Sequence, residues 1–175
     1  MKALAIGVAV LLLSSCASYD GRGLVPGQSS AKDVEAVMGA PKERITVAGG
    51  DSVWFYPRNP FGLETYAARI SPQGTLVSLD QRLTVENLGK LQIGASTSKD
   101  VRELLGPPWR VTHAALQPRE VWHYRMDNGY LIEHNLFVQI SPDLVVREVL
   151  LLRDPKYDLG ERSGFGSGFG FGFRF

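Results

Sequence analysis

The stretch LQIGASTSKDVRELLGPP, residues 91–108, repeats an earlier stretch of the chain, LVPGQSSAKDVEAVMGAP at residues 24–41. The matching positions share one constant offset: Gly27 with Gly94, Lys32-Asp33-Val34 with Lys99-Asp100-Val101, Gly39 with Gly106, and Pro41 with Pro108. Two copies of one structural unit therefore organise the chain.

We predict that each copy contains a short capped helix. Ser30 and Thr97 stand at N-cap positions, and Asp33 and Asp100 follow three residues later, where a carboxylate can accept hydrogen bonds from free amides of the first turn. Apolar residues then recur at helical spacing: Val34, Val37 and Met38 in one copy, and Val101, Leu104 and Leu105 in the other. Gly39 and Gly106 are expected to end the helices in the left-handed conformation. A helix of about two turns is unstable alone, so each must pack on another element.

Strand-like segments follow each helix and indicate what it packs on. They are residues 44–48, 52–56, 65–71 and 75–79 in the first copy, and 110–114, 120–125, 130–141 and 144–152 in the second. The repeat continues through them, since Val53-Trp54-x-Tyr56 matches Val121-Trp122-x-Tyr124 and Ile70-Ser71-Pro72 matches Ile140-Ser141-Pro142. The predicted fold class is α+β. It has two tandem units, each with a short helix or helices on one face of a three- or four-stranded antiparallel sheet whose other face is free for a partner.

The amino-terminal segment, residues 1–15, is predicted to be a lipoprotein signal peptide. Lys2 precedes a short apolar run that ends in Leu13-Ser14-Ser15-Cys16, and this run is too short to span a membrane. Leu-Ser-Ser-Cys resembles the lipobox of bacterial lipoproteins, which implies a diacylglyceryl and an N-acyl chain on Cys16, the only cysteine. An ordinary secretory signal that leaves a free thiol is the alternative. By the same resemblance, Ala17 after the cysteine implies sorting to the outer membrane.

Five segments are expected: the signal peptide (1–15), the lipidated N-terminus and tether (16–23), the first unit (24–88), the second unit (89–155) and a Gly/Phe-rich tail (156–175). The chain carries 19 Lys and Arg against 18 Asp and Glu, so it lacks the basic balance of a nucleic-acid-binding protein. Its lone cysteine provides no intramolecular disulfide, so packing alone must hold the fold.

No catalytic or metal-binding constellation stands out. The three histidines, His113, His123 and His134, lack the i, i+4 spacing of a helical metal site, and His123 and His134 fall in separate predicted strands. Nucleophile-elbow and phosphate-loop motifs are absent, and the glycine-rich tail lacks the third glycine of a dinucleotide fingerprint. We predict neither an enzyme nor a protein with a cofactor, a metal or a small-molecule substrate.

Two aromatic pairs are candidate partner-binding residues: Trp54 with Tyr56, and Trp122 with Tyr124. Residues two apart share one face of a strand, so each pair acts together. Packing in the core beneath the helix is the favoured interpretation, because large aromatic side chains dominate small cores. The alternative places the pairs on the exposed sheet face as a binding platform.

The tail alternates phenylalanine with mainly glycine and ends with Phe173-Arg174-Phe175. Its composition favours a disordered extension. The alternative is a strand that places Phe173 and Phe175 on one face, resembles the C-terminal signal strand of outer-membrane β-barrel proteins, and adds to the sheet edge of a partner.

The repeated pattern, followed by its Trp-x-Tyr strand, resembles the SmpA/OmlA (BamE-like) lipoprotein family and the wider β-lactamase-inhibitor-protein-like fold over residues 24–153. Familiar members of the first family carry one such unit and this chain has two, so no interface residue is transferred. The resemblance implies a periplasm-facing, lipid-anchored outer-membrane scaffold that binds envelope proteins, including the β-barrel assembly machinery, or supports envelope integrity. An inhibitor of a secreted or periplasmic enzyme is the alternative; an envelope hydrolase finds no support in the residues.

Overall fold

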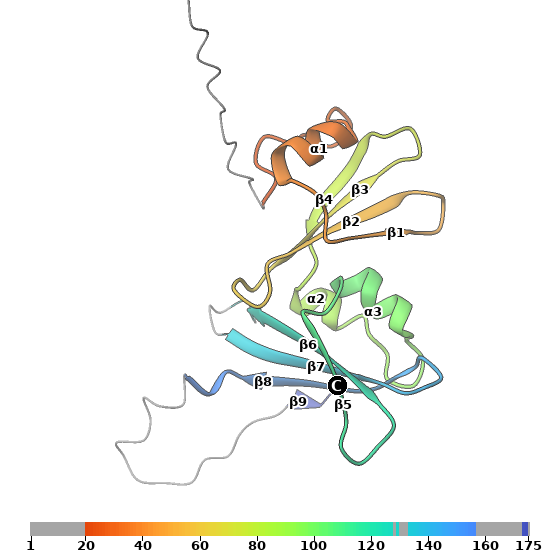
Figure 1. Ribbon diagram of the computed structural model, residues 1–175, viewed down its shortest axis with the longest axis vertical. Coiled ribbons are helices and arrows are strands. Elements are labelled where there is room, and N and C mark those ends of the chain that lie inside the picture. The colour runs from red at the N-terminus through yellow and green to blue at the C-terminus, as the bar shows by residue number, and fades with distance from the viewer. Residues whose placement is uncertain (1–19, 128, 130–132, 157–172, 175) are drawn as a thin grey trace, which may run out of the picture.

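The computed structural model describes residues 20–127, 129, 133–156 and 173–174 (Figure 1). The predicted signal peptide, Cys16 and the start of the tether lie outside these residues, so the lipid anchor stays a prediction. Most of the predicted disordered tail, residues 157–172 and Phe175, also lies outside them.

The first unit is one helix followed by an antiparallel sheet in chain order. The helix is α1 (Ala31–Met38), and the strands are β1 (Glu43–Thr46), β2 (Ser52–Pro57), β3 (Thr65–Ile70) and β4 (Leu76–Gln81). Their boundaries lie within a few residues of the predicted ones.

The second unit repeats this order after a one-turn helix, α2 (Val85–Leu88). Its elements are α3 (Ser98–Leu105), β5 (Arg110–His113), β6 (Glu120–Asp127), β7 (Glu133–Ile140), β8 (Val146–Arg153) and β9 (Phe173–Arg174), with the five strands hydrogen-bonded in chain order. An α+β protein of two units with antiparallel sheets is therefore confirmed. The second sheet has one strand more than predicted, because β9 from the tail pairs with β8.

The two repeated helices, α1 and α3, each begin with the predicted capping box. The amides of Asp33 and Asp100 lie 3.3 Å from the hydroxyls of Ser30 and Thr97, and their carboxylates accept the N-cap amides at 2.7 Å. The helices end at Gly106 and its counterpart Gly39 as predicted, but with a different conformation. Their φ angles are positive (83° and 79°), whereas their ψ angles of −173° and −168° are extended instead of left-handed helical. Glycine alone populates this region readily.

The chain before α1 is hydrogen-bonded to β4, and the chain before α3 is hydrogen-bonded in the same way to β8. The amide of Gly27 donates to Leu76 O at 2.7 Å, and the amide of Gly94 donates to Val146 O at 2.8 Å. Ser29 O and Ser96 O accept from the same two strand residues at 2.8 Å. Both repeats therefore fix the start of the helix against the sheet edge.

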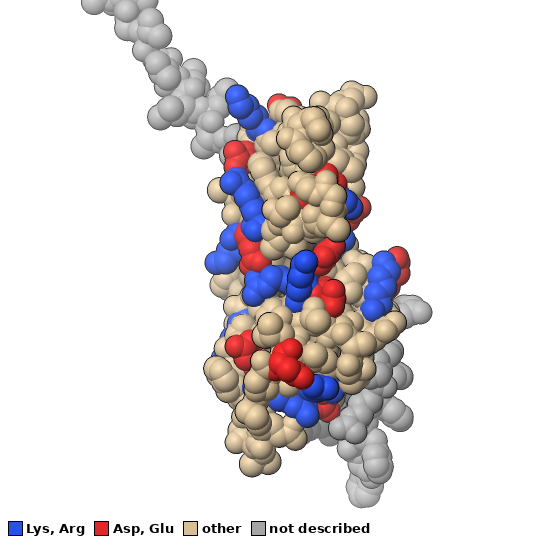
Figure 2. Space-filling view, turned by 90° about the vertical axis from the view of Figure 1, so that its right-hand side faces the viewer, with Lys and Arg blue, Asp and Glu red and all other residues tan. Residues whose placement is uncertain are grey.

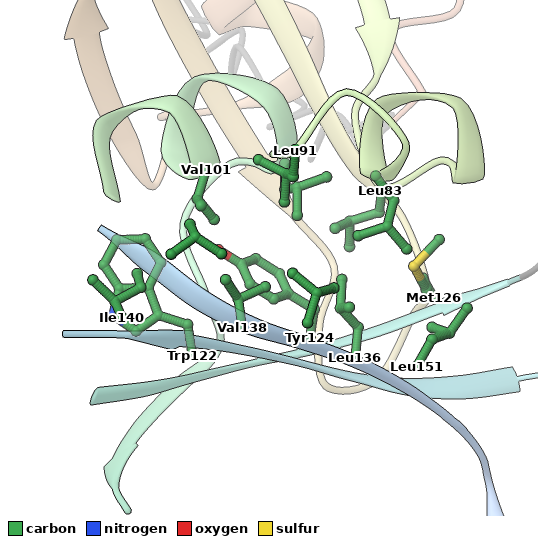
Figure 3. Close-up of a cluster of buried hydrophobic side chains, with 14 residues drawn as sticks. Leu83, Leu91, Val101, Trp122, Tyr124, Met126, Leu136, Val138, Ile140 and Leu151 are labelled. Atoms are coloured by element: carbon green, nitrogen blue, oxygen red, sulfur yellow. The ribbon is translucent and has the colours of Figure 1, made fainter. Parts of the chain in front are cut away.

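Three buried apolar clusters organise the molecule. One contains α1 residues Val34 and Met38 with sheet residues Trp54, Tyr56, Ala68, Ile70 and Leu76. The largest belongs to the second unit, where Leu91 and Val101 point toward the sheet residues Trp122, Tyr124 and Val138 (Figure 3). The third lies on the other side of the first sheet and contains Val47, Val53, Phe55 and Ala67.

The end of α3 closes the third cluster. A methyl group on Gly106 would lie 2.7 Å from Thr65 Cγ2 and 3.1 Å from Phe55 Cδ1, so the two units are in direct contact there. In Figure 1, α2 and α3 lie between the two sheets. The expectation that each sheet leaves one face free is therefore wrong for the first sheet, because the second unit occupies that face.

The connection between the units packs with the second one. Leu83 and Leu88 lie in the second unit's buried cluster, although the predicted boundary at residue 88 assigns them to the first unit. An ion pair between Arg102 of α3 and Glu43 of β1, at 2.5 Å, also bridges the units.

Candidate protein-binding surface

The four aromatic candidates Trp54, Tyr56, Trp122 and Tyr124 are buried, with at most 9% of each exposed. They belong to the clusters that α1 and α3 share with the sheets. The interpretation that these four residues form an exposed binding platform is therefore wrong. Their burial agrees with the alternative interpretation, in which they pack in the core. A guanidinium group lies over the ring of each tryptophan: Arg44 is 4.3 Å from the Trp54 ring centroid and Arg102 is 4.8 Å from that of Trp122.

The two tyrosine hydroxyls differ in their hydrogen bonding. Tyr124 donates to Gly106 O at 3.0 Å and thereby ties β6 to the end of α3. The Tyr56 hydroxyl is buried without a hydrogen-bond partner among the described residues. Burial raises the pKa of Tyr56 to about 12 and raises the pKa of Tyr124 as well. Both phenols are neutral at physiological pH, as expected of structural groups.

Among the described residues, one sheet face is left uncovered, on the side of the second sheet away from α2 and α3. We call it the open face and define it by the outward positions of three strands: Val121, His123, Arg125, Asn135, Phe137, Gln139, Glu148, Leu150 and Leu152. Cross-strand partners share a face, so the register alone places them together. Each of these residues is partly or fully exposed, whereas the alternate positions on β6 and β7 between them are buried from Trp122 to Met126 and from Leu136 to Ile140.

An aromatic cluster occupies the centre of the open face. The rings of His123 and Phe137 meet edge to face at 5.0 Å between centroids, and Trp109, just before β5, meets His123 in the same way at 6.2 Å. Nε2 of His123 lies 2.7 Å from the Thr112 hydroxyl. Burial, and to a lesser degree the charge of Arg110, lowers the pKa of His123, so its ring is neutral at pH 7. The centre of the open face is therefore uncharged and partly apolar.

Ion pairs frame this centre at both ends of the strands. At one end, Arg125 lies 2.6 Å from Glu133, which also bonds to Lys156. At the other end, Arg119 lies 4.0 Å from Glu148 and donates to Gln139 at 3.2 Å. An apolar centre with aromatic residues and a charged rim is typical of a protein-binding surface.

The loop between β2 and β3 is anchored beside this rim. The Asn59 side chain donates to Arg125 O at 3.0 Å and accepts from the Arg125 amide at 2.5 Å, and Pro60 O accepts from the Arg125 guanidinium. Phe61, at the tip of the loop, is fully exposed and helps line a surface hollow of about 300 Å³. A large apolar side chain on an anchored loop is a second feature suited to protein recognition.

Comparison with known proteins gives no family. No protein-family model matches the chain, and no curated protein matches it significantly. Among solved structures, the crystal structure of a DUF4309 family protein (YjgB) from Bacillus subtilis is 25% identical, covers 76% of this chain and 84% of its own, and has a TM-score of 0.30. A similarity at that level carries no argument about this chain.

The described residues offer no metal site and no helical membrane span. His123 belongs to the open face, His134 is opposite the buried Met126, and His113 is at the edge strand β5, so the fold separates them. No group of three or more His, Cys, Asp or Glu side chains in the described ranges could hold a metal ion. Within the same ranges, every helix is too short or too polar to cross a membrane.

Charge on the molecular surface is mixed in sign. Figure 2 shows Lys and Arg interspersed with Asp and Glu on one side of the molecule, without separation into a basic and an acidic patch. This distribution gives no electrostatic footprint for nucleic acid on that side.

Sequence reasoning missed Trp109, Phe137 and Phe61 as candidate binding residues. The signal was available for Phe137, because β6 and β7 alternate buried and outward positions and His123 is opposite Phe137. Of the two tail candidates, Phe173 lies in β9 and Phe175 lies outside the described residues.

Proposed function

We propose that this protein is a non-catalytic, lipid-anchored binding protein on the periplasmic face of the outer membrane. In this proposal α1 and α3 pack on one face of their sheets, and the open face of the second sheet binds an envelope protein. The process proposed for this binding is β-barrel outer-membrane protein assembly or envelope integrity, as the family resemblance implies. The observation that carries the proposal is the Trp109–His123–Phe137 cluster at the centre of the only sheet face in the described residues that the fold leaves uncovered.

Affinity capture from detergent-solubilised membranes tests the binding role. The wild-type protein is expected to retain envelope proteins, including β-barrel assembly components, and Phe137→Ser is expected to lose them. Val77→Ser is the matched control, since Val77 is a 46% exposed apolar residue on β4, away from the open face. Capture of the same partners by a folded Phe137→Ser protein would show that the open face is not the binding site.

The anchor has a separate test. Cys16→Ala is expected to move the protein from the membrane fraction to the soluble periplasmic fraction. Recovery of this variant in the membrane pellet would contradict a lipid anchor at Cys16.

The exposed Phe61 favours a second function, inhibition of a secreted or periplasmic enzyme. A fully exposed aromatic side chain on an anchored loop can insert into the pocket of an enzyme. Under this alternative, capture yields one soluble enzyme, and Phe61→Ala removes it while Phe137→Ser does not.

A further inference from the structure

The described part of the molecule is built of layers that alternate between helix and sheet. Along the long axis of Figure 1, α1 is followed by the first sheet, then by α2 and α3, and then by the second sheet. The helix layer of the second unit thus lies on a sheet face of the first, and Gly106 meets Thr65 and Phe55 there. Among the described residues, α1 lies at one end of this stack and the open face lies at the other.

The α1 end corresponds to the helix side of the contact between the two units. At the constant offset of the repeat, Arg102 and Gly106 of the second unit align with Glu35 and Gly39 of the first. Gly106 is buried, whereas Gly39 is partly exposed and the next residue, Ala40, is exposed. The end of α1 therefore presents to solvent the positions that the end of α3 uses against a sheet.

The open face corresponds to the sheet side of the same contact. Phe55 and Ala67 are cross-strand partners on the face that the second unit covers, and His123 and Phe137 are cross-strand partners on the open face. Phe55 and His123 both stand between the tryptophan and the tyrosine of the repeated Trp-x-Tyr pattern, so the two pairs occupy the same place in their sheets. The end of a helix placed there as α3 is placed on the first sheet would meet His123 and Phe137.

The charges of the existing contact recur at the two ends of the stack with their signs exchanged. Within the chain, Arg102 of α3 pairs with Glu43 of β1 at 2.5 Å. Arg110 of β5 occupies the place of Glu43, because each is the strand partner of the residue inside the Trp-x-Tyr pattern. Glu35 of α1 occupies the place of Arg102. An α1 helix on the open face would therefore set Glu35 against Arg110, a pair of opposite charge.

Both charged groups are accessible for such a pair. Arg110 is exposed and forms no ion pair within the described part of the chain. Glu35 pairs with Arg44 of its own unit, yet its side chain is 45% exposed. Its carboxylate has acceptor sites for a second guanidinium group.

We propose that a second copy of this chain covers the open face with its α1 helix. Copies then associate head to tail and continue the alternation of helix and sheet layers. The two surfaces in contact differ, so the contact is heterologous and produces closed rings or open chains of copies. The inference rests on the function proposed above in one respect, that the open face is a protein-binding surface, and it names the occupant of that surface.

Residue size agrees with the charges in favouring a copy of this chain as the occupant. The open face has Phe137 where the covered face has Ala67, so its centre is bulkier. The end of α1 has Ala40 where the end of α3 has Pro107, so the helix side is smaller. A gain of volume on one surface is thus matched by a loss on the other, as complementary surfaces require.

Self-association of the full-length protein in detergent, measured by sedimentation velocity, tests this inference. The wild-type protein is expected to associate reversibly, with a mass that rises with concentration. Glu35→Arg and Arg110→Glu each bring like charges together and are expected to weaken the association at least about fivefold. Lys99→Glu is the matched control, because it reverses an exposed charge in the first turn of α3, outside both surfaces, and is expected to change nothing.

A mixture of the two weakened variants gives the sharper result. The α1 helix of the Glu35→Arg protein suits the open face of the Arg110→Glu protein. The α1 helix of the Arg110→Glu protein is unchanged and meets an unchanged open face on the Glu35→Arg protein. An equimolar mixture is therefore expected to associate nearly as well as the wild-type protein, although neither variant does so alone.

Three results would overturn the proposal. The wild-type protein could stay monomeric at its highest soluble concentration, or the mixture could associate no better than its components. Wild-type association of the Glu35→Arg protein alone would also overturn it, because a contact that leaves α1 out, such as one between two open faces, would not respond to this change.

Other variants keep the proposal falsifiable if circular dichroism shows that Glu35→Arg does not fold. Arg110→Glu and Phe137→Ser are then expected to weaken self-association, and unchanged association of both would overturn the proposal.

The inference and the proposed function fail in different ways. A monomeric wild-type protein that captures envelope proteins through Phe137 would refute self-association alone. A protein that associates with its own copies as described, and captures no other protein, would support the inference and refute the role in envelope assembly.

Discussion

Replacing Gly106 with alanine tests how closely the end of α3 is packed against the first sheet. The new methyl group would lie 2.7 Å from Thr65 Cγ2 and 3.1 Å from Phe55 Cδ1, and both of these residues are almost completely buried. Gly106 also has φ 83° and ψ −173°, a conformation that alanine rarely adopts. The backbone contributes about 1–3 kcal/mol and the overpacking about 1–3 kcal/mol. We expect the free energy of unfolding to fall by roughly 4 kcal/mol, the midpoint of these two contributions combined.

Gly94→Ala is the matched control for this substitution. Gly94 has φ 82°, but a methyl group there would meet no heavy atom within 4 Å. Its substitution therefore carries the backbone cost alone, about 1–3 kcal/mol. Urea unfolding followed by tryptophan fluorescence gives both values, provided that the slope of each transition is unchanged.

Thr65→Ser identifies the contact, because it removes Cγ2 and keeps the hydroxyl. In a double-mutant cycle with Gly106→Ala, we expect a favourable coupling of about 1 kcal/mol or more, since the closest of the two overlaps is relieved. If Gly106→Ala costs no more than Gly94→Ala and shows no coupling to Thr65→Ser, the two units are not in the contact described above.

Three further substitutions test other parts of the fold. Tyr124→Phe removes the hydrogen bond to Gly106 O and is expected to cost about 1–2 kcal/mol in urea unfolding, whereas Tyr56→Phe, whose hydroxyl is unpaired, is expected to be close to neutral. Leu144 has φ 66°, whereas the corresponding residue of the first unit is Gly74. Leu144→Gly should therefore raise the thermal midpoint, by an amount that corresponds to a stabilisation of about 1 kcal/mol. An unchanged midpoint would show that Leu144 is not strained. Asp33→Asn with Asp100→Asn should lower stability at pH 7. Hydrogen bonds from the N-cap residues hold the pKa of both carboxyls below 3.8, so the stabilisation is complete above that value and is lost as the pH falls through the folded-state pKa. A wild-type advantage that does not shrink as the pH is lowered from 7 into the acid range would contradict this assignment.

The local structure could be predicted from the sequence because each repeat contains its own helix start and stop signals. The pairs Ser30–Asp33 and Thr97–Asp100 determine where the helices begin, and both capping boxes are present. Gly39 and Gly106 determine where they end, although the sequence could not distinguish an extended ψ from a left-handed helical one.

The covering of one face of the first sheet by the second unit was not predicted, yet the strands contained a signal for it. β2, SVWFYP, is apolar at every central position and is buried on both faces. In β6, EVWHYRMD, buried and partly exposed residues alternate, so this strand is buried on one face only. Continuous apolar runs indicate strands covered on both sides, and alternating ones indicate a solvated face. The two strands share the Trp-x-Tyr pattern, but the residue between the two aromatic residues differs: it is Phe55 in the first repeat and His123 in the second.

The remaining differences depend on long-range contacts that local patterns do not contain. The bonds from Asn59 to Arg125 link residues far apart in the sequence, and the Asn-Pro-Phe-Gly segment predicts only a loop. The return of the tail to β8 likewise depends on an edge whose position is known only once the sheet is assembled.

Because Phe55 and Ala67 are buried beneath the end of α3, the first repeat depends on the second to cover its apolar sheet face. A chain shortened to its first repeat would present Val53, Phe55 and Ala67 to water, and such a bare apolar sheet face favours aggregation. The first repeat thus depends on the second for solubility, whereas the second keeps a solvated outer surface. A protein with this first repeat alone would need more polar side chains at these three positions to avoid exposing an apolar sheet face.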